Sequence, residues 1–268
     1  DENFDHARVP KIGVLLVNMG TPDAPTAAAL RSYLKQFLWD ARVIEYPRIL
    51  WWLILHLFVL TRRPKRSAAL YAKVWTAEGS PLLVYSRRQT LALEKELKKS
   101  LGDSIVVGLG MRYGNPSIPS ALNALRKKGM RRLLVLPLYP QYSGTTTASG
   151  VDAIADELRT WRWVPEIRTV NQYHDDPGYI AALAESVREV WAREGEPEKL
   201  LMSFHGIPKR YFMNGDPYHC QCLKTGRLLG EKLGLSPERY QVCFQSLFGR
   251  EEWLKPYTNE TLISWAKQ

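Results

Sequence analysis

The segment RRLLVLPLYP, residues 131–140, decides the fold class of this chain of 268 residues. Its centre, LLVLPL, is apolar throughout and lacks the alternating polar residues of a strand with one face in water. A strand of this kind is buried on both faces, as the strands of parallel sheets are. The segment therefore predicts a parallel sheet that is covered by helices.

Other strand candidates lie on both sides of this segment, and helix-like stretches separate them. The other strand candidates are residues 12–20, 104–114, 166–174, 199–206 and 239–246. The helix candidate 177–195 has proline at its start and glycine at its end, the order typical of helices. Strands that alternate with helices predict an α/β fold, and we expect two doubly wound layers with a break near residues 137–143.

The composition indicates a globular cytoplasmic protein with an anionic partner. The formal net charge is +10, which suits nucleic acid, anionic lipid or an acidic small molecule. The sequence shows no nucleic-acid-binding motif, so we expect no nucleic-acid partner. Three cysteines do not suggest a disulfide scaffold, and the polar start DENFDHARVP is unlike a signal peptide.

The segment ILWWLILHLFVL, residues 49–60, is apolar except for one histidine. A membrane-spanning helix needs about 20 apolar residues, so this segment is too short to span a bilayer. It predicts either a buried helix or an interfacial anchor. The second interpretation rests on its two tryptophans and on the basic residues that follow at 62–66.

Ligands of doubly wound folds bind beyond the carboxyl ends of the strands. His205 has that place in the segment LMSFHGIPKR, residues 201–210. The same rule puts residues 18–20, 112–113, 139–143 and 245–246 beside it on one rim. An imidazole exchanges protons near neutral pH and binds divalent metals, so His205 is the candidate catalytic residue. The alternative is a structural histidine that forms a hydrogen bond at the strand end.

Two other motifs point to different chemistry. GLGMRYG, residues 108–114, has the glycines of a dinucleotide-binding turn and leaves an NADP-binding oxidoreductase as an alternative. Its bulky residues, however, crowd a turn that must let a pyrophosphate approach. A metal site is also suggested by the segment His219-Cys220-Gln221-Cys222 together with Cys243. However, residues two apart on a helix point about 200° apart, so both thiols cannot easily bind one ion and we expect structural cysteines.

Seven segments of the chain resemble the ferrochelatase family between Lys11 and about residue 266. They are LLVNMGTP (15–22), EGSPL (78–82), GMRYGNP (110–116), LYPQYSGTTTAS (138–149), SFHGIP (203–208), GDPY (215–218) and FQSLFGREEWLKPYTNETL (244–262). The resemblance implies two similar Rossmann-like, chelatase-type domains, residues 1–138 and 139–268, with a porphyrin cleft between them. It also implies a lyase of haem biosynthesis that inserts Fe²⁺ into protoporphyrin IX and releases two protons.

The resemblance assigns roles to individual residues. His205 would be the catalytic residue as proton acceptor, as metal ligand, or as both. Met19 would lie against the macrocycle on the face opposite His205. Arg63 and Lys65 would meet the propionates at the mouth of the pocket. The other substrate-binding residues implied by the motifs are Tyr71, Arg112, Tyr113, Tyr139, Gln245, Ser246 and Trp253.

The resemblance also gives the apolar segment 49–60 a use. Family members that act on protoporphyrin carry a hydrophobic lip, which admits an apolar substrate and often contacts the bilayer. Relatives that act on the more polar coproporphyrin lack much of this lip. We therefore expect protoporphyrin IX and ferrous iron as partners, and a cytoplasmic location with peripheral membrane contact through residues 49–60.

The chain departs from the family pattern in two places. The family has a later motif in which a histidine is followed two residues on by a glutamate and then by Thr-Leu, and this motif does not occur before Gln268. We therefore expect a fragment, with a non-catalytic porphyrin-binding fragment as an alternative function. Where some members have a cluster-binding cysteine, this chain has Gly144. We expect Fe²⁺ as a substrate, no required cofactor and no [2Fe–2S] cluster.

Overall fold

The computed structural model describes residues 5–247, 249 and 251–267. The chain divides into two compact units: unit 1 is Asp1–Tyr139 with Gly144–Asn171, and unit 2 is Pro140–Ser143 with Gln172–Gln268. The sequence predicts a boundary between residues 138 and 139, but Gly144–Asn171 groups with unit 1. The reason is that strand β4 (Glu166–Thr169) pairs with strand β3 (Met130–Pro137) of that unit.

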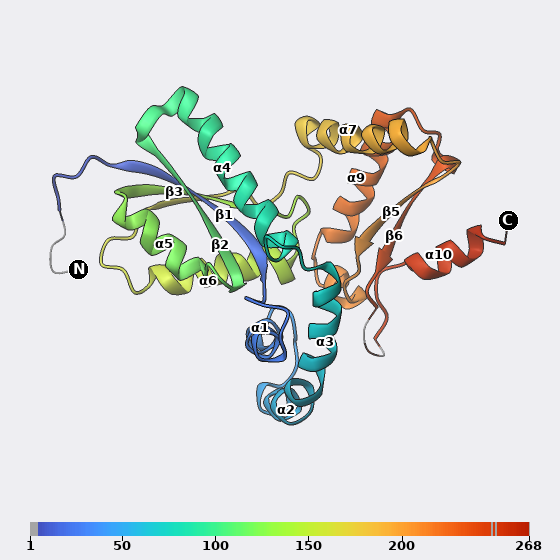
Figure 1. Ribbon diagram of the computed structural model, residues 1–268, viewed down its shortest axis with the longest axis horizontal. Coiled ribbons are helices and arrows are strands. Elements are labelled where there is room, and N and C mark those ends of the chain that lie inside the picture. Colours follow the sequence, from blue (N-terminus) through green and yellow to red (C-terminus); the bar gives the residue numbers. More distant parts are fainter. Residues whose placement is uncertain (1–4, 248, 250, 268) are drawn as a thin grey trace. The chain divides into compact units, whose positions relative to one another are not determined.

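Unit 1 alternates strands and helices along most of its length (Figure 1). Its other elements are β1 (Lys11–Thr21), α1 (Ala27–Trp39), α2 (Arg48–Ile54), the π-helix η1 (Leu55–Val59), α3 (Leu60–Val74), α4 (Pro81–Leu101), the 3₁₀ turn η2 (Gly102–Ser104), β2 (Ile105–Gly114), α5 (Ile118–Lys127), the π-helix η3 (Gly144–Ala148) and α6 (Ser149–Leu158).

The four strands of unit 1 form a parallel sheet in the order β2-β1-β3-β4. β1 pairs with β2 on one side and β3 on the other, so it is an internal strand. Successive side chains point to opposite faces. Leu15 and Val17 pack in a core with residues of α5 and α6, whereas Val14 and Leu16 pack in a second core with leucines of α4. The predicted doubly wound α/β sheet, covered on both faces, is confirmed.

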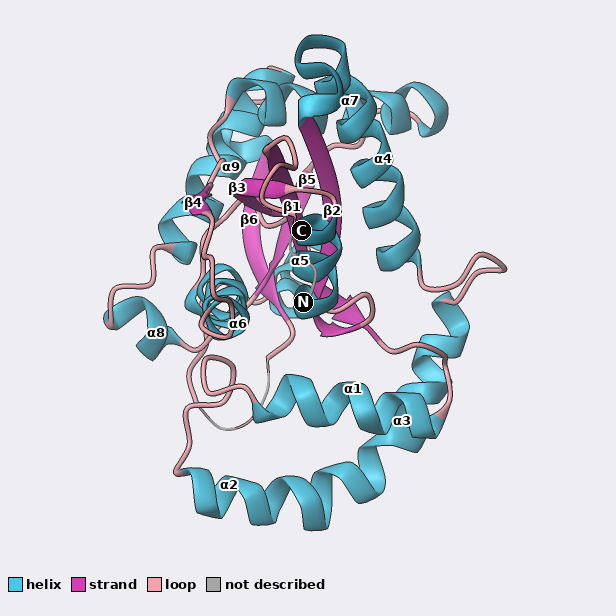
Figure 2. Ribbon diagram, turned by 90° about the vertical axis from the view of Figure 1, so that its left-hand side faces the viewer, coloured by secondary structure: helices cyan, strands magenta, loops and turns pink. Residues whose placement is uncertain are grey.

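A layer of helices extends beyond the carboxyl ends of the strands of unit 1. Figure 2 shows α1, α2 and α3 lying beside one another there. α1 contacts the ends of the two neighbouring strands, because Tyr33 Oη donates to the Gly20 carbonyl at 3.3 Å and Gln36 Oε1 accepts from the Gly114 amide at 3.0 Å. Leu55 and Leu60 are buried among residues of α1. This layer therefore covers the edge where a doubly wound fold binds its ligands.

Unit 2 contains a parallel pair of strands, β5 (Leu200–His205) and β6 (Tyr240–Gln245). Its helices are α7 (Pro177–Glu194), α8 (Lys209–Met213), α9 (Tyr218–Leu233), the 3₁₀ turn η4 (Pro237–Arg239) and α10 (Thr258–Trp265). Met202 and Val242 pack with Ala184 of α7 and Leu229 of α9 in the core of this unit. On the other face of the pair, Thr258 at the start of α10 contacts both strands.

Within the described part of the chain, no helix is both long enough and apolar enough to cross a bilayer. The predicted apolar segment 49–60 forms α2 and η1, and it continues directly into α3.

Candidate functional site

His205 is the last residue of β5 and lies directly opposite Gln245, the last residue of β6. Met202 and Phe204 point into the core of unit 2, and the strand alternation turns Ser203 and His205 away from that core. The side chain of His205 is therefore exposed at the carboxyl end of a parallel strand pair. This is the edge at which doubly wound folds place their ligands.

The backbone fixes which ring nitrogen of His205 carries a proton. Nδ1 lies 2.6 Å from the carbonyl oxygen of Gly206. A carbonyl oxygen only accepts hydrogen bonds, so Nδ1 must be the donor. In the neutral ring, Nε2 then has the free lone pair. A histidine held in this way presents one nitrogen that accepts a proton or binds a metal.

Three further residues of unit 2 lie close to His205. The ring of Trp253 is centred 6.4 Å from the imidazole. Between them, the Gly206 amide donates to the Gln245 carbonyl at 2.7 Å, and a Cβ atom at Gly206 would lie 3.2 Å from the Trp253 ring. Ser246 follows at the end of β6 with φ of 73°, the only positive φ of a non-glycine residue in the described ranges. The structure thus brings together His205, Gln245, Ser246 and Trp253.

The site residues expected in unit 1 also lie at the carboxyl ends of strands. Met19 is near the end of β1, Arg112 and Tyr113 are near the end of β2, and Tyr139 follows β3. The sequence predicts one rim for all of these positions, whereas the strands belong to two separate sheets. The residues therefore occupy the carboxyl edges of two sheets, because β5 and β6 pair only with each other among the described strands.

Tyr113 is buried more deeply than a pocket-lining residue would be, with 1% of its surface exposed. Its ring makes edge contacts with Phe37 at 5.2 Å and Tyr33 at 6.4 Å. Met19 and Tyr71 pack against the same cluster. Burial raises the pKa of the Tyr113 phenol, so the hydroxyl keeps its proton and acts as a hydrogen-bond donor.

Asp40 joins Arg112, Tyr113 and Ser149, and sequence reasoning missed it. Its Oδ2 accepts from Arg112 Nη2 at 2.5 Å, from Tyr113 Oη at 2.8 Å and from Ser149 Oγ at 2.5 Å. Its Oδ1 accepts from the Arg42 amide at 2.7 Å. Four hydrogen bonds therefore converge on one buried carboxylate at the carboxyl edge of the first sheet.

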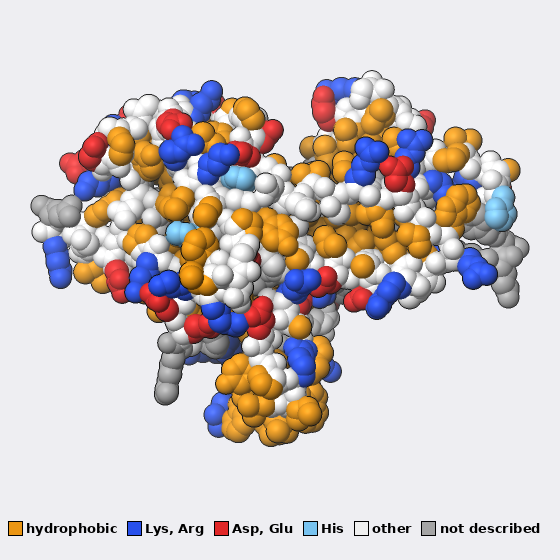
Figure 3. Space-filling model, turned by 180° about the vertical axis from the view of Figure 1, so that it is seen from behind, with side chains coloured by type: hydrophobic (Ala, Val, Ile, Leu, Met, Phe, Trp, Pro, Cys, Tyr) orange, Lys and Arg blue, Asp and Glu red, His pale blue; other side chains and the backbone are white. Residues whose placement is uncertain are grey.

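Arg63 and Lys65 lie in α3 and are exposed. They follow an exposed apolar surface formed by α2 and η1, which we call the apolar lip. Its exposed residues are Ile49, Leu50, Trp52, Leu53, Leu57 and Phe58. Figure 3 shows hydrophobic side chains gathered over this part of unit 1. The segment is thus a helix with one buried side, which carries Leu55 and Leu60, and an apolar side in water.

The glycine motif at residues 108–114 does not form a phosphate-binding turn. All of it lies within β2, and no loop separates its glycines. The absence of side chains serves helix packing instead, because a Cβ atom at Gly108 would lie 3.2 Å from Leu125 and one at Gly110 would lie 3.1 Å from Ile118. The glycines therefore let α5 approach the sheet, and the dinucleotide-binding interpretation is wrong.

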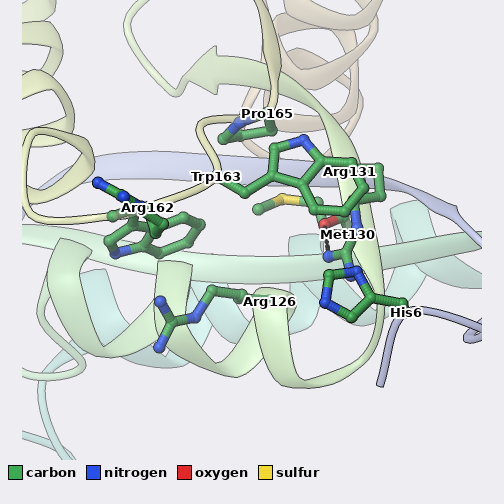
Figure 4. Close-up of a pocket in the computed structure, with 8 residues that line it drawn as sticks. His6, Arg126, Met130, Arg131, Arg162, Trp163 and Pro165 are labelled. Atoms are coloured by element: carbon green, nitrogen blue, oxygen red, sulfur yellow. Dashed lines mark hydrogen bonds between the residues drawn. The ribbon is translucent and has the colours of Figure 1, made fainter. Parts of the chain in front are cut away.

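A cavity of about 280 Å³ lies at the opposite edge of the first sheet, where β3 begins (Figure 4). It is lined by His6, Arg126, Met130, Arg131, Trp161, Arg162, Trp163 and Pro165. Arg126 stacks over Trp161 at 4.7 Å and Arg131 over Trp163 at 4.5 Å. These contacts pack the loop before β4 against α5 and β3. The predicted site residues do not line this cavity.

Cys220 and Cys222 lie on α9 and point in different directions, as their spacing predicts. Cys220 is exposed and Cys222 is buried, so the two thiols lie on different sides of α9. In the described ranges, no three acidic, histidine or cysteine side chains are grouped to hold a metal ion.

Comparison with known proteins gives consistent matches over this whole arrangement. A protein-family model described as ferrochelatase matches residues 11–268. The chain is 57% identical over 265 residues to a ferrochelatase of Nitrosococcus oceani, covering 99% of this chain and 72% of that protein. It is 57% identical over 262 residues to a ferrochelatase of Thioalkalivibrio sulfidiphilus, with coverages of 98% and 71%. A ferrochelatase of Marinobacter nauticus is 53% identical over 261 residues, with coverages of 97% and 70%.

Proposed function

The chain belongs to the ferrochelatase family, with that family's function in haem biosynthesis, and from this premise we propose that His205 carries the chemistry of iron insertion. The protein is a metal chelatase, a lyase whose substrates are protoporphyrin and ferrous iron. The observation that supports the role of His205 is its exposed imidazole, in which the Gly206 carbonyl leaves the Nε2 lone pair free.

The reaction makes two demands on the protein. The porphyrin must lose two pyrrole protons, and its four nitrogens must bind Fe²⁺. A base held at a fixed orientation supports the first demand, and typical general bases contribute about 10²–10⁴-fold in rate. The neutral His205 ring offers Nε2 as proton acceptor, as metal ligand, or as both in succession. Binding energy from the rest of the site supports bending of the macrocycle, which exposes its nitrogen lone pairs.

The remaining site residues supply binding rather than proton transfer. We propose that Met19, Arg112 and Tyr71 hold the porphyrin, and that Tyr113 acts indirectly because it is buried. The other residues to which we assign porphyrin contacts are Arg63, Lys65, Tyr139, Gln245, Ser246 and Trp253. The reaction needs no resident cofactor, and residue 144, a glycine at the start of η3, offers no ligand for a [2Fe–2S] cluster. We propose no nucleic-acid partner, because the sequence has no nucleic-acid-binding motif.

Replacement of His205 by glutamine tests the assignment. The His205→Gln side chain is polar and similar in length but has no basic nitrogen, so we expect haem formation to fall at least about 100-fold. Haem formation from protoporphyrin and Fe²⁺ is followed anaerobically by visible absorbance. Ser203→Ala is the matched control, because Ser203 lies two residues earlier on the same exposed face of β5. We expect it to retain most of the wild-type rate.

The folded state and porphyrin binding are measured alongside. His205 is exposed, so the variant should unfold at the same temperature as the wild type. Near-normal haem formation by His205→Gln would contradict the proposal. Wild-type protein that shifts the porphyrin absorbance but forms no haem would instead support a non-catalytic porphyrin-binding fragment.

We further propose that the apolar lip contacts the membrane surface, which is where the protein would acquire protoporphyrin in the cytoplasm. Exposed apolar and tryptophan side chains beside Arg62, Arg63, Lys65 and Arg66 are typical of an interfacial helix. Leu57→Ser/Phe58→Ser should reduce cosedimentation with vesicles that contain phosphatidylserine. Leu262→Ser/Ile263→Ser on α10 changes two side chains of similar exposure elsewhere and should not. Equal cosedimentation of both double variants would refute the membrane contact.

A further inference from the structure

We propose that Asp40 is a positioning residue that holds Arg112 ready for contact with the porphyrin, an inference that rests on the proposed function. Asp40 follows α1, whereas Arg112 belongs to β2 and Ser149 begins α6. The carboxylate therefore connects three elements of unit 1 at the carboxyl edge of its sheet.

The position of Asp40 in the chain is unfavourable on local grounds. It is the C-cap residue of α1, where the last backbone carbonyl groups carry partial negative charge. A carboxylate at this end of a helix is destabilising unless other groups compensate for it. In proteins, such violations of a local rule concentrate at functional sites. The compensation here comes from residues distant in the sequence, one of which is Arg112.

The surroundings keep Asp40 ionised. Burial alone would raise the pKa of this carboxyl group, but the hydrogen bonds from Ser149, Tyr113 and the Arg42 amide, together with the charge of Arg112, outweigh burial. The net result is a pKa below the ordinary value. Asp40 and Arg112 therefore form an ion pair at neutral pH, with Nη2 and Oδ2 at 2.5 Å.

This ion pair fixes the orientation of the Arg112 guanidinium. The Arg112 Nε also donates to Ser149 Oγ at 2.7 Å, and the Arg112 Cζ lies 4.8 Å from the centre of the Tyr113 ring. One edge and one face of the group are thus occupied. The Arg112 side chain is nevertheless 25% exposed, whereas that of Asp40 is 5% exposed. The guanidinium therefore has N–H groups left for a ligand, because it carries five in all.

The consequence is a lower cost of binding. A free arginine side chain loses conformational freedom when a ligand orders it, and one that is already held loses less. Asp40 itself is too buried to contact the porphyrin and acts through Arg112. Loss of the Asp40 charge should therefore weaken porphyrin binding and leave the chemistry at His205 unchanged.

Asp40→Asn tests this inference in the complete chain. The amide is similar in size but has no charge and one acceptor fewer. We expect the dissociation constant for protoporphyrin, measured by fluorescence without iron, to rise about tenfold, and the KM for porphyrin to rise similarly while kcat changes less than threefold. Asp152→Asn is the matched control, because it removes a carboxylate paired with Arg42 at 2.8 Å on the surface of the same unit. We expect no change in porphyrin binding from this control.

A double-mutant cycle separates positioning from a purely structural role. On an Arg112→Ala background, Asp40→Asn should cause no further loss of porphyrin binding, because the side chain that it positions is gone. Additive losses would overturn the inference, as would wild-type affinity of Asp40→Asn in a protein that still forms haem. If Asp40→Asn does not fold, Ser149→Ala takes its place, with an expected rise of about threefold and the same non-additivity. Wild-type protein that binds no protoporphyrin would overturn the proposed function together with this inference.

Discussion

Gly20→Ala should destabilise unit 1 strongly, because β1 and β2 approach each other closely at this point. Gly20 has φ of 105°, and an added Cβ atom would lie 1.7 Å from the carbonyl oxygen of Tyr113. This oxygen belongs to the backbone of a paired strand, so the strands themselves must separate. The unfavourable φ costs about 1–3 kcal/mol for a residue with a side chain. The forced separation adds about 1–3 kcal/mol, as overpacking usually does.

Gly79→Ala is the matched control for this prediction. Gly79 has φ of 112°, but nothing lies within 4 Å of an added Cβ atom. The control therefore isolates the conformational cost. Urea denaturation followed by circular dichroism measures the free energy of unfolding of both variants. We expect Gly20→Ala to lose about 1–3 kcal/mol more than Gly79→Ala. Equal losses would refute the argument that strand contact decides the cost at Gly20.

Three further predictions concern the site and the buried groups. Gly206→Ala should lower haem formation about tenfold or more, because the added Cβ atom would lie 2.9 Å from the Gln245 carbonyl oxygen and would displace the backbone beside His205. An unchanged rate of haem formation would contradict this prediction. Iodoacetamide at pH 8 should alkylate the exposed Cys220 but not Cys222, because Cys222 is buried and burial raises the pKa of its thiol to about 12. Mass spectrometry measures the labelling, and equal labelling of the two cysteines would refute this prediction. Burial, and to a smaller extent the nearby Tyr179, raise the pKa of Tyr173 from 10.0 to about 12. The neutral phenol therefore stabilises the folded state fully below pH 10, and this stabilisation is lost as the pH rises toward 12. A free energy of unfolding that does not change between pH 10 and pH 12 would contradict this prediction.

The strands were the most predictable part of the fold, because burial on both faces leaves a direct mark on the sequence. The run 12–20 predicts β1, which spans Lys11–Thr21. The run 166–174 predicts a longer strand than Glu166–Thr169. The chain leaves the sheet there, and the Tyr173 amide instead donates to the Pro140 carbonyl in unit 2. A strand-like run of residues does not encode such a change of partner.

The site was predictable at strand ends and unpredictable elsewhere. His205 follows from its place after an apolar strand, since the carboxyl edge of a parallel sheet is a known location for ligands. Asp40 carries no such signal, because its partners Arg112 and Ser149 lie 72 and 109 residues away. The stretch 143–161 reads as one helix, but its first turn is the π-helix η3, which has no distinct composition.

The left-handed backbone of Ser246 has a cost that glycine would not incur. An L-residue loses about 1–2 kcal/mol in this conformation, and glycine adopts it freely. Ser246→Gly should therefore make the protein harder to unfold. If the hydroxyl serves the porphyrin, the same change should slow turnover, so that thermal robustness and catalytic output move in opposite directions at this one position.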